Sequence, residues 1–249
     1  MNKSQTGQKK HFIITPGRAG STLFCSILAH GGADFGMPLT EAWDRRAGAY
    51  EHIQVDQASS HAKRALELKQ NSKMSKWVML KRKYHRRMTK LNLATVLNKA
   101  DYCKNSDADL VRWARGLGYQ PSVLLLYRSF DRYCVSNFLR SGGSYARLME
   151  HYANSIETGI LAMKTFGGCV IDFDQVLDPQ QTQWARNVAE LTGLDADALL
   201  NYRNDIVKPT SHEQNTLPLH DPRIQAIEQA IAACVGRVFP PTAQAKRGV

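Results

Sequence analysis

The stretch HFIITPGRAGSTLFCSILAH, residues 11–30, decides which fold class the chain is expected to adopt. Residues 11–15 are mostly apolar or β-branched, which favours a buried strand, and residues 21–30 have the spacing of an amphipathic helix. Between them lies a tight turn that contains Gly17 and Gly20. A strand that leads through such a turn into a helix is typical of α/β proteins.

The same alternation of short apolar runs and longer helical patterns continues along the chain. Further strands are predicted at residues 77–80, 122–127 and 169–173. Helices are predicted at residues 57–70, 106–116, 130–139, 145–163, 180–192 and 222–235. Because continuous apolar runs indicate strands buried on both faces, we expect an α/β fold with a central parallel sheet flanked by helices.

Length and composition favour a single soluble domain over residues 1–249, without an internal repeat or linker. A chain of this size buries roughly three quarters of the surface that its unfolded form exposes. We expect residues 1–10 and 240–249 to be disordered. The five cysteines lack a C-x-x-C pair, which suits the reduced thiols of a cytoplasmic protein. No apolar run is long enough to predict a signal segment or a membrane span.

The formal net charge of +11 predicts an anionic partner without saying which anion. Part of the excess lies in one stretch that contains no acidic residue. Its basic residues are Lys73, Lys76, Lys81, Arg82, Lys83, Arg86, Arg87 and Lys90. Two interpretations stay open, because such a run is either the solvated face of a helix or one wall of an anion pocket.

The turn at the start of the chain has the chemistry of an anion cradle. A helix N-terminus offers unpaired N–H groups and a partial positive charge, and Gly17 and Gly20 let an anion approach the backbone. Arg18 adds a fixed positive group, and the hydroxyls of Ser21 and Thr22 can donate hydrogen bonds. An ordinary strand–turn–helix connection is the alternative. A Walker A loop is excluded, because that motif needs a lysine where this chain has Gly20.

A second motif, SVLLLYRSFDRYCVSNF, spans residues 122–138. The predicted strand ends at Arg128, and Ser136 follows eight residues later, about two turns into the next helix. Ligands of open α/β sheets bind at the carboxyl ends of the strands. Arg128 is therefore expected to face the ligand, whereas an ordinary ion pair is the alternative.

Together the two motifs resemble those of the PAPS-dependent sulfotransferases, where PAPS is 3′-phosphoadenosine 5′-phosphosulfate. The string TPGRAGST is similar to the 5′-phosphosulfate loop of that family. The resemblance implies that the 5′ end of PAPS is bound by Arg18, Ala19, Gly20, Ser21 and Thr22. It also implies that Arg128 and Ser136 bind the 3′-phosphate, although Phe130 stands where the family usually has proline. A P-loop-like sulfotransferase fold, with PAPS as co-substrate and no metal, is expected from this resemblance.

Weaker similarities suggest catalytic residues. In residues 31–52, Glu41 follows a proline as a family acid does, which makes it our first candidate for the general base, ahead of Glu51 and His52. The run WVMLK, residues 77–81, is similar to a family strand that ends in lysine, so Lys81 is expected to contact the bridging oxygen or the sulfonate. The segment VIDFDQVLDP, residues 170–179, resembles a strand that precedes a late helix of the family.

The expected activity is transfer of a sulfuryl group from PAPS to a hydroxyl or amine of an unidentified acceptor, such as a carbohydrate or small metabolite, giving 3′,5′-ADP. Three alternatives stay open. The first is a kinase or NTPase built on a related sheet, and the second is a basic nucleic-acid-binding module. The third is a sulfotransferase that binds the nucleotide but has lost turnover. The sequence does not indicate the oligomeric state.

Overall fold

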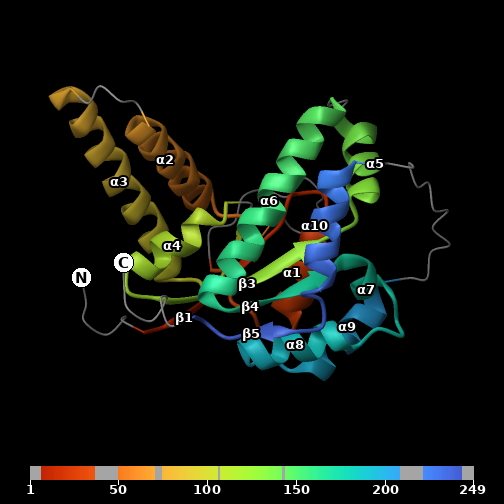
Figure 1. Cartoon of the computed structure of the whole chain (residues 1–249). Helices are drawn as coiled ribbons and strands as arrows, with labels where there is room; N and C mark the ends of the chain where they lie inside the picture. Colours follow the sequence, from red (N-terminus) through yellow and green to blue (C-terminus); the bar gives the residue numbers. More distant parts are fainter. Residues whose placement is uncertain are drawn as a thin grey trace.

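The computed structural model describes residues 7–36, 50–70, 75–105, 107–141, 144–207 and 221–242. In these ranges, helices cover both faces of a five-stranded sheet (Figure 1). The strands are β1 (Lys9–Ile14), β2 (Tyr102–Asn105), β3 (Gln120–Tyr127), β4 (Gly168–Asp172) and β5 (Val238–Phe239). The helices are α1 (Ser21–His30), α2 (Ile53–Gln70), α3 (Lys76–Leu97), α4 (Asp109–Gly116), α5 (Phe130–Ser141), α6 (Tyr145–Phe166), α7 (Phe173–Leu177), α8 (Gln183–Thr192), α9 (Ala196–Ile206) and α10 (Pro222–Ala232).

The sheet has the strand order β2-β1-β3-β4-β5. The pairs β1–β2, β1–β3 and β3–β4 are parallel, and only the short β5 runs antiparallel to its neighbour β4. The prediction of an α/β fold with a mainly parallel central sheet is therefore confirmed. Three of the four predicted strands, those that begin near residues 11, 122 and 169, occur as β1, β3 and β4.

Alternate residues of the central strands divide the core into two layers. Phe12 and Ile14 of β1 pack on the side of α4, α6 and α10, whereas Ile13 packs on the side of α1, α8 and α9. All three side chains are fully buried, as expected for strands covered on both faces. Figure 1 shows α6 and α10 above the sheet and α8 and α9 below it, with the α2–α3 hairpin extending to the upper left.

The topology reverses direction at β1. After β1 the chain enters α1 on one face of the sheet. The later connection from β2 to β3 runs through α4 on the opposite face, and β2 and β3 lie on either side of β1. The carboxyl ends of strands at such a switch point border the crevice where open α/β sheets bind ligands. The first candidate site therefore lies beyond the end of β1, where the glycine-containing turn begins.

The predicted strand at residues 77–80 is wrong, because these residues form the start of α3. Ser75 caps this helix by accepting a hydrogen bond from the N–H of Val78 at 3.3 Å, and Lys81 lies over the ring of Trp77 one turn away, 5.7 Å from its centroid. The side chain of Trp77 is 64% exposed. The apolar run is thus an exposed helix face, and the burial that would favour a strand is missing.

The described residues extend past the limits of 10 and 240 at which we expect disorder. β1 begins at Lys9, and the buried Lys10 donates to the carbonyl of Ala100 and pairs with Asp101, both at 2.8 Å. At the other end, the N–H of Thr242 donates to the carbonyl of Thr165 at 3.1 Å. Among the described helices, none is both long enough and apolar enough to cross a membrane.

We predict that His11 makes the stability of the protein depend on pH. Its Nδ1 lies 2.7 Å from Oγ of Ser122, joining β1 to β3, and burial, assisted by the charge of Lys9, lowers its pKa from 6.5 to about 4. Between pH 6.5 and pH 4 this histidine is protonated in the unfolded chain but stays neutral in the folded chain. The free energy of unfolding should therefore fall as the pH falls from 6.5 to 4, by roughly 3 kcal/mol at 1.36 kcal/mol per pKa unit.

Urea titrations of the wild type and of His11→Gln across this pH range test the prediction. The variant should lose most of this part of the pH dependence, since glutamine does not titrate. If the free energy of unfolding depends on pH equally in the two proteins, His11 is not the responsible group.

Candidate functional site

The turn between β1 and α1 is held in an unusual backbone conformation. Gly17, Arg18 and Gly20 have φ values of 83°, 52° and 72°, all in the left-handed region. Gly20 is the N-cap of α1, and it has no side chain that could cap the first turn of this helix. The first N–H groups of α1 are therefore available to a ligand, as in sites where anions bind helix N-termini.

The position of Gly20 is fixed by a close contact with α7. A Cβ atom at residue 20 would lie 1.9 Å from Cζ of Phe173, so any side chain larger than hydrogen collides with the ring. Phe173 is the first residue after β4, and its side chain is 5% exposed. The aromatic ring thus sets how closely the turn packs against the end of β4.

A cavity of about 190 Å³ opens beside the turn, at the carboxyl ends of β1 and β2. Lys104 near the end of β2 projects into this region with only 6% of its side chain exposed. Its Nζ pairs with Oε1 of Glu51 at 2.7 Å and lies 3.4 Å from Oγ1 of Thr22. A buried ammonium group therefore stands between the first turn of α1 and a carboxylate.

Two further polar residues line this cavity beside Lys104. Nδ2 of Asn105 donates to Oδ1 of Asp56 at 3.2 Å. Burial raises the pKa of Asp56, and the negative charge of the nearby Glu51 adds to the effect. The cavity therefore holds two carboxylates, Glu51 and Asp56, next to one buried cation.

His151 of α6 closes the other side of the cavity. Its Nε2 lies 3.1 Å from the carbonyl oxygen of Pro16, and because a carbonyl oxygen can only accept, this nitrogen carries the proton. In the neutral ring, Nδ1 is then the nitrogen that can accept a proton. The histidine is exposed to solvent at the mouth of the cavity.

A second cationic centre lies where β3 ends. Nε of Arg128 donates to Oδ1 of Asp174 at 3.1 Å, and Nη1 of Arg132 donates to the same oxygen at 2.6 Å. The guanidinium of Arg128 also lies over the ring of Phe173, 5.6 Å from its centroid. The hydroxyl of Tyr152 donates a hydrogen bond to the backbone carbonyl of Arg128 at 2.9 Å. One carboxylate thus pairs with two arginines that are each less than one third exposed, which leaves the group with a net positive charge.

Ser136 follows these arginines along α5. Arg132 and Ser136 stand four residues apart on α5 and so share one face of this helix, whereas Arg128 lies just before it. Ser136 is half-buried. The spacing seen in the sequence therefore corresponds to a polar stripe on α5, formed by Arg132 and Ser136, that follows Arg128 at the end of β3.

The structure brings some of the predicted site residues to the strand ends and places others elsewhere. The turn from Arg18 to Thr22 and the Arg128 centre lie at the carboxyl ends of adjacent strands, β1 and β3. Glu51 lines the cavity, whereas His52 is buried and its Nε2 contacts the carbonyl of Phe35. Glu41 lies outside the described residues.

The predicted role of Lys81 at a strand end fails, because Lys81 is an exposed residue of α3. Lys104 occupies that place instead, since β2 pairs with β1 and brings Lys104 to the turn. Sequence reasoning missed β2 because it has only four residues, YCKN, two of them polar. The acidic Asp101 just before this stretch and the turn that follows were the only local signals.

No protein-family model matches this chain, and no curated protein does either. Among the described residues, no group of three or more His, Cys, Asp or Glu side chains could hold a metal ion. The site is therefore defined by its own geometry: a left-handed turn at a helix N-terminus, a buried lysine beside it, and a pair of arginines at the next strand end.

We predict that Gly20 tolerates alanine much less than Gly17 does. Both residues have positive φ, so both substitutions share a backbone strain of about 1 kcal/mol. Only at Gly20 does the new methyl group meet Phe173, whereas a Cβ at Gly17 has no atom within 4 Å. Overpacking of this kind costs about 1–3 kcal/mol in addition.

The free energy of unfolding of both variants, measured by urea denaturation, tests this contact. Gly20→Ala should be less stable than Gly17→Ala by at least about 1 kcal/mol. If the two variants are equally stable, the ring of Phe173 does not fix the turn.

Proposed function

We propose that this protein is a sulfotransferase that uses PAPS as the donor. The observation that carries the proposal is the pair of cationic centres at neighbouring strand ends, one built on the turn after β1 and one on Arg128 and Arg132. PAPS carries two separate anionic groups, a 5′-phosphosulfate and a 3′-phosphate. A site with two cationic centres suits such a nucleotide better than it suits a nucleotide that carries a single phosphate chain.

In this proposal the 5′ end of PAPS lies over the turn. The N–H groups at the start of α1 and the hydroxyls of Ser21 and Thr22 bind the phosphate oxygens. The guanidinium of Arg18 and Nζ of Lys104 supply positive charge. Lys104 is now paired with Glu51, and the incoming anion competes with that carboxylate.

The 3′-phosphate lies at the Arg128 centre. Asp174 holds the two arginine side chains in place, and a phosphate that approaches them meets groups already oriented for it. Ser136 completes the contact from the next turn of the polar stripe. Adjacent parallel strands are about 4.8 Å apart, so the ends of β2 and β3, on either side of β1, are separated by roughly 10 Å. This scale suits a ribose with anionic groups at both its 3′ and 5′ positions.

The transfer itself is an in-line displacement at sulfur. A bond forms between the acceptor oxygen and sulfur, and the bond between sulfur and the bridging oxygen of the 5′-phosphate breaks. The electron pair of the broken bond stays on 3′,5′-ADP, where Lys104 and the amides of the turn stabilise the new charge. Glu51 or Nδ1 of His151 takes the proton of the acceptor hydroxyl, because both line the cavity beside the turn.

The state of the cysteines supports a cytoplasmic location. Cys25, Cys103, Cys134, Cys169 and Cys234 are all unpaired and buried. Reduced cysteines are usual in the cytoplasm, so we propose that the enzyme acts there.

The main competing function is a kinase or NTPase, for which Glu51 and Asp56 would be the carboxylates nearest the turn.

We expect 3′,5′-ADP to bind the wild type much more tightly than 5′-AMP, without a requirement for magnesium. Arg128→Ala should weaken the binding of 3′,5′-ADP by about 10- to 150-fold, the equivalent of one charge-assisted hydrogen-bonded contact. The binding of 5′-AMP should change little, because this nucleotide lacks the 3′-phosphate. Isothermal titration calorimetry measures all three affinities.

Arg186→Ala is the matched control, because Arg186 is an exposed arginine of α8, on the other face of the sheet. It removes the same charge and should leave both affinities unchanged. Tight binding of magnesium-ATP together with no binding of 3′,5′-ADP would reject the sulfotransferase and favour the kinase or NTPase.

A further inference from the structure

A second and larger pocket lies away from the sheet edge, between the α2–α3 hairpin and α4. Its volume is about 430 Å³, within the range of roughly 300–1,000 Å³ that is usual for small-molecule sites. No residue that lines it also lines the cavity beside the turn after β1. The function proposed above therefore leaves this pocket without a role.

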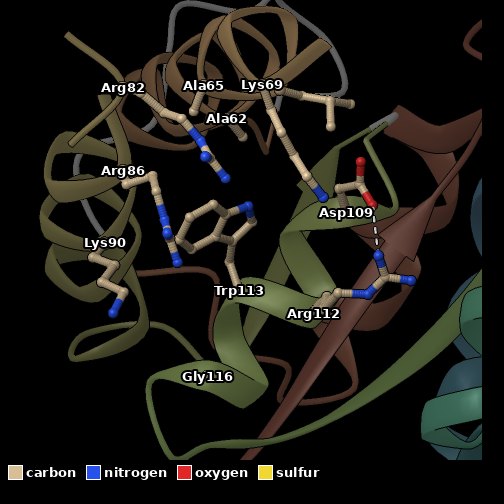
Figure 2. Close-up of a pocket in the computed structure, with 11 residues that line it drawn as sticks. Ala62, Ala65, Lys69, Arg82, Arg86, Lys90, Asp109, Arg112, Trp113 and Gly116 are labelled. Atoms are coloured by element: carbon tan, nitrogen blue, oxygen red, sulfur yellow. Dashed lines mark ion pairs between the residues drawn. The ribbon is translucent and has the colours of Figure 1, made fainter. Parts of the chain in front are cut away.

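The charge of the pocket is strongly one-sided. Five cations from three helices line it, and they are Lys69 of α2, Arg82, Arg86 and Lys90 of α3, and Arg112 of α4. The only acid in the lining is Asp109, which pairs with Arg112 at 3.8 Å. Figure 2 shows Arg82 and Arg86 on one wall and Lys69 on the other. The guanidinium of Arg82 is directed to the space above Trp113, the guanidinium of Arg86 lies beside the indole, and the charged end of Lys69 is directed toward Asp109.

The least exposed cation of the set has an unused donor. Nε of Arg82 is buried from solvent and has no hydrogen-bond partner among the described residues. A buried N–H group without a partner is destabilising, so a ligand that accepts this hydrogen bond gains affinity. An unpaired guanidinium N–H inside a cationic pocket therefore points to an anionic ligand.

The other walls give the pocket its shape. The indole of Trp113 forms the floor, and the guanidinium of Arg86 lies over this ring at 5.9 Å from its centroid. Ala62 and Ala65 of α2 are the small residues that leave the space open. The cations are thus spread around an aromatic floor, and one phosphate group cannot reach all of them.

We propose that this pocket binds a small molecule that carries several phosphate or sulfate groups on a compact ring. Cations on opposite walls suit charges spaced around such a ring, and Arg82 and Lys69 contact different groups of the same ligand. The basic stretch of α3 divides accordingly. Arg82, Arg86 and Lys90 face the pocket, whereas Lys83 and Arg87 are exposed and do not line it.

Inositol hexakisphosphate serves as the probe, titrated calorimetrically into the full chain in the presence and absence of 3′,5′-ADP. We expect binding that 3′,5′-ADP does not block, since the two sites share no residue. Arg82→Gln should weaken it about tenfold or more, as expected when a charge-assisted contact is lost. Lys69→Gln, on the opposite wall, should do the same and gives a second test if Arg82→Gln unfolds.

Arg87→Gln is the matched control, because it removes one charge from the same helix but outside the pocket. It should leave the affinity for the probe within about twofold. If Arg87→Gln weakens the probe as much as Arg82→Gln does, binding depends on the overall charge of α3 and the pocket proposal is wrong.

A DNA duplex of random sequence, titrated at moderate salt, covers the nucleic-acid alternative. Tight binding of the duplex that both arginine variants weaken equally would identify α3 as a nucleic-acid-binding face and overturn the proposal. The outcome is independent of the sheet-edge site, which the 3′,5′-ADP titration tests separately.

Discussion

The contact between Gly20 and Phe173 is the constraint on which the candidate site depends. Because residue 20 has no side chain, the turn after β1 packs directly against the residue that follows β4. The same aromatic ring lies under the guanidinium of Arg128 at the end of β3. One phenyl ring thus links the N-terminus of α1 to the arginine centre, and it fixes the spacing of the two cationic groups.

Around this constraint, carboxylates hold each cationic centre in a fixed orientation. Glu51 pairs with Lys104, and Asp174 pairs with both Arg128 and Arg132. Positioned cations need little rearrangement when an anionic ligand arrives, which is the usual advantage of a preorganised site. The pocket between α2, α3 and α4 differs, because only one of its five cations has a carboxylate partner in the lining.

Local sequence patterns predicted the parts of the fold that local interactions determine. The strand, turn and helix from β1 to α1 were predicted correctly, because a continuous apolar run, two glycines and a helical spacing lie within twenty residues. The positions of Arg128 just after a buried strand and of Ser136 on the next helix were predicted for the same reason. The run at residues 77–80 was wrongly predicted to be a strand, since its apolar side chains are compatible with either a strand or a helix until their exposure is known.

The parts that could not be predicted depend on contacts between distant residues. Lys104 reaches Thr22 across 82 residues, His151 reaches Pro16 across 135, and Asp174 reaches Arg128 across 46. None of these pairs has a signature in its own neighbourhood. The cationic pocket is a similar case, because the basic run of α3 gives no sign of which arginines turn toward α4.

A crystal structure of the complex with 3′,5′-ADP tests the central claim most directly. The account predicts that the 5′-phosphate lies on the N–H groups of the turn at Gly20 and Ser21, near Nζ of Lys104. The 3′-phosphate should lie against Arg128 and Ser136. A nucleotide bound with its 3′-phosphate away from Arg128, or bound in the α2–α3–α4 pocket instead, would contradict the proposed sulfotransferase site.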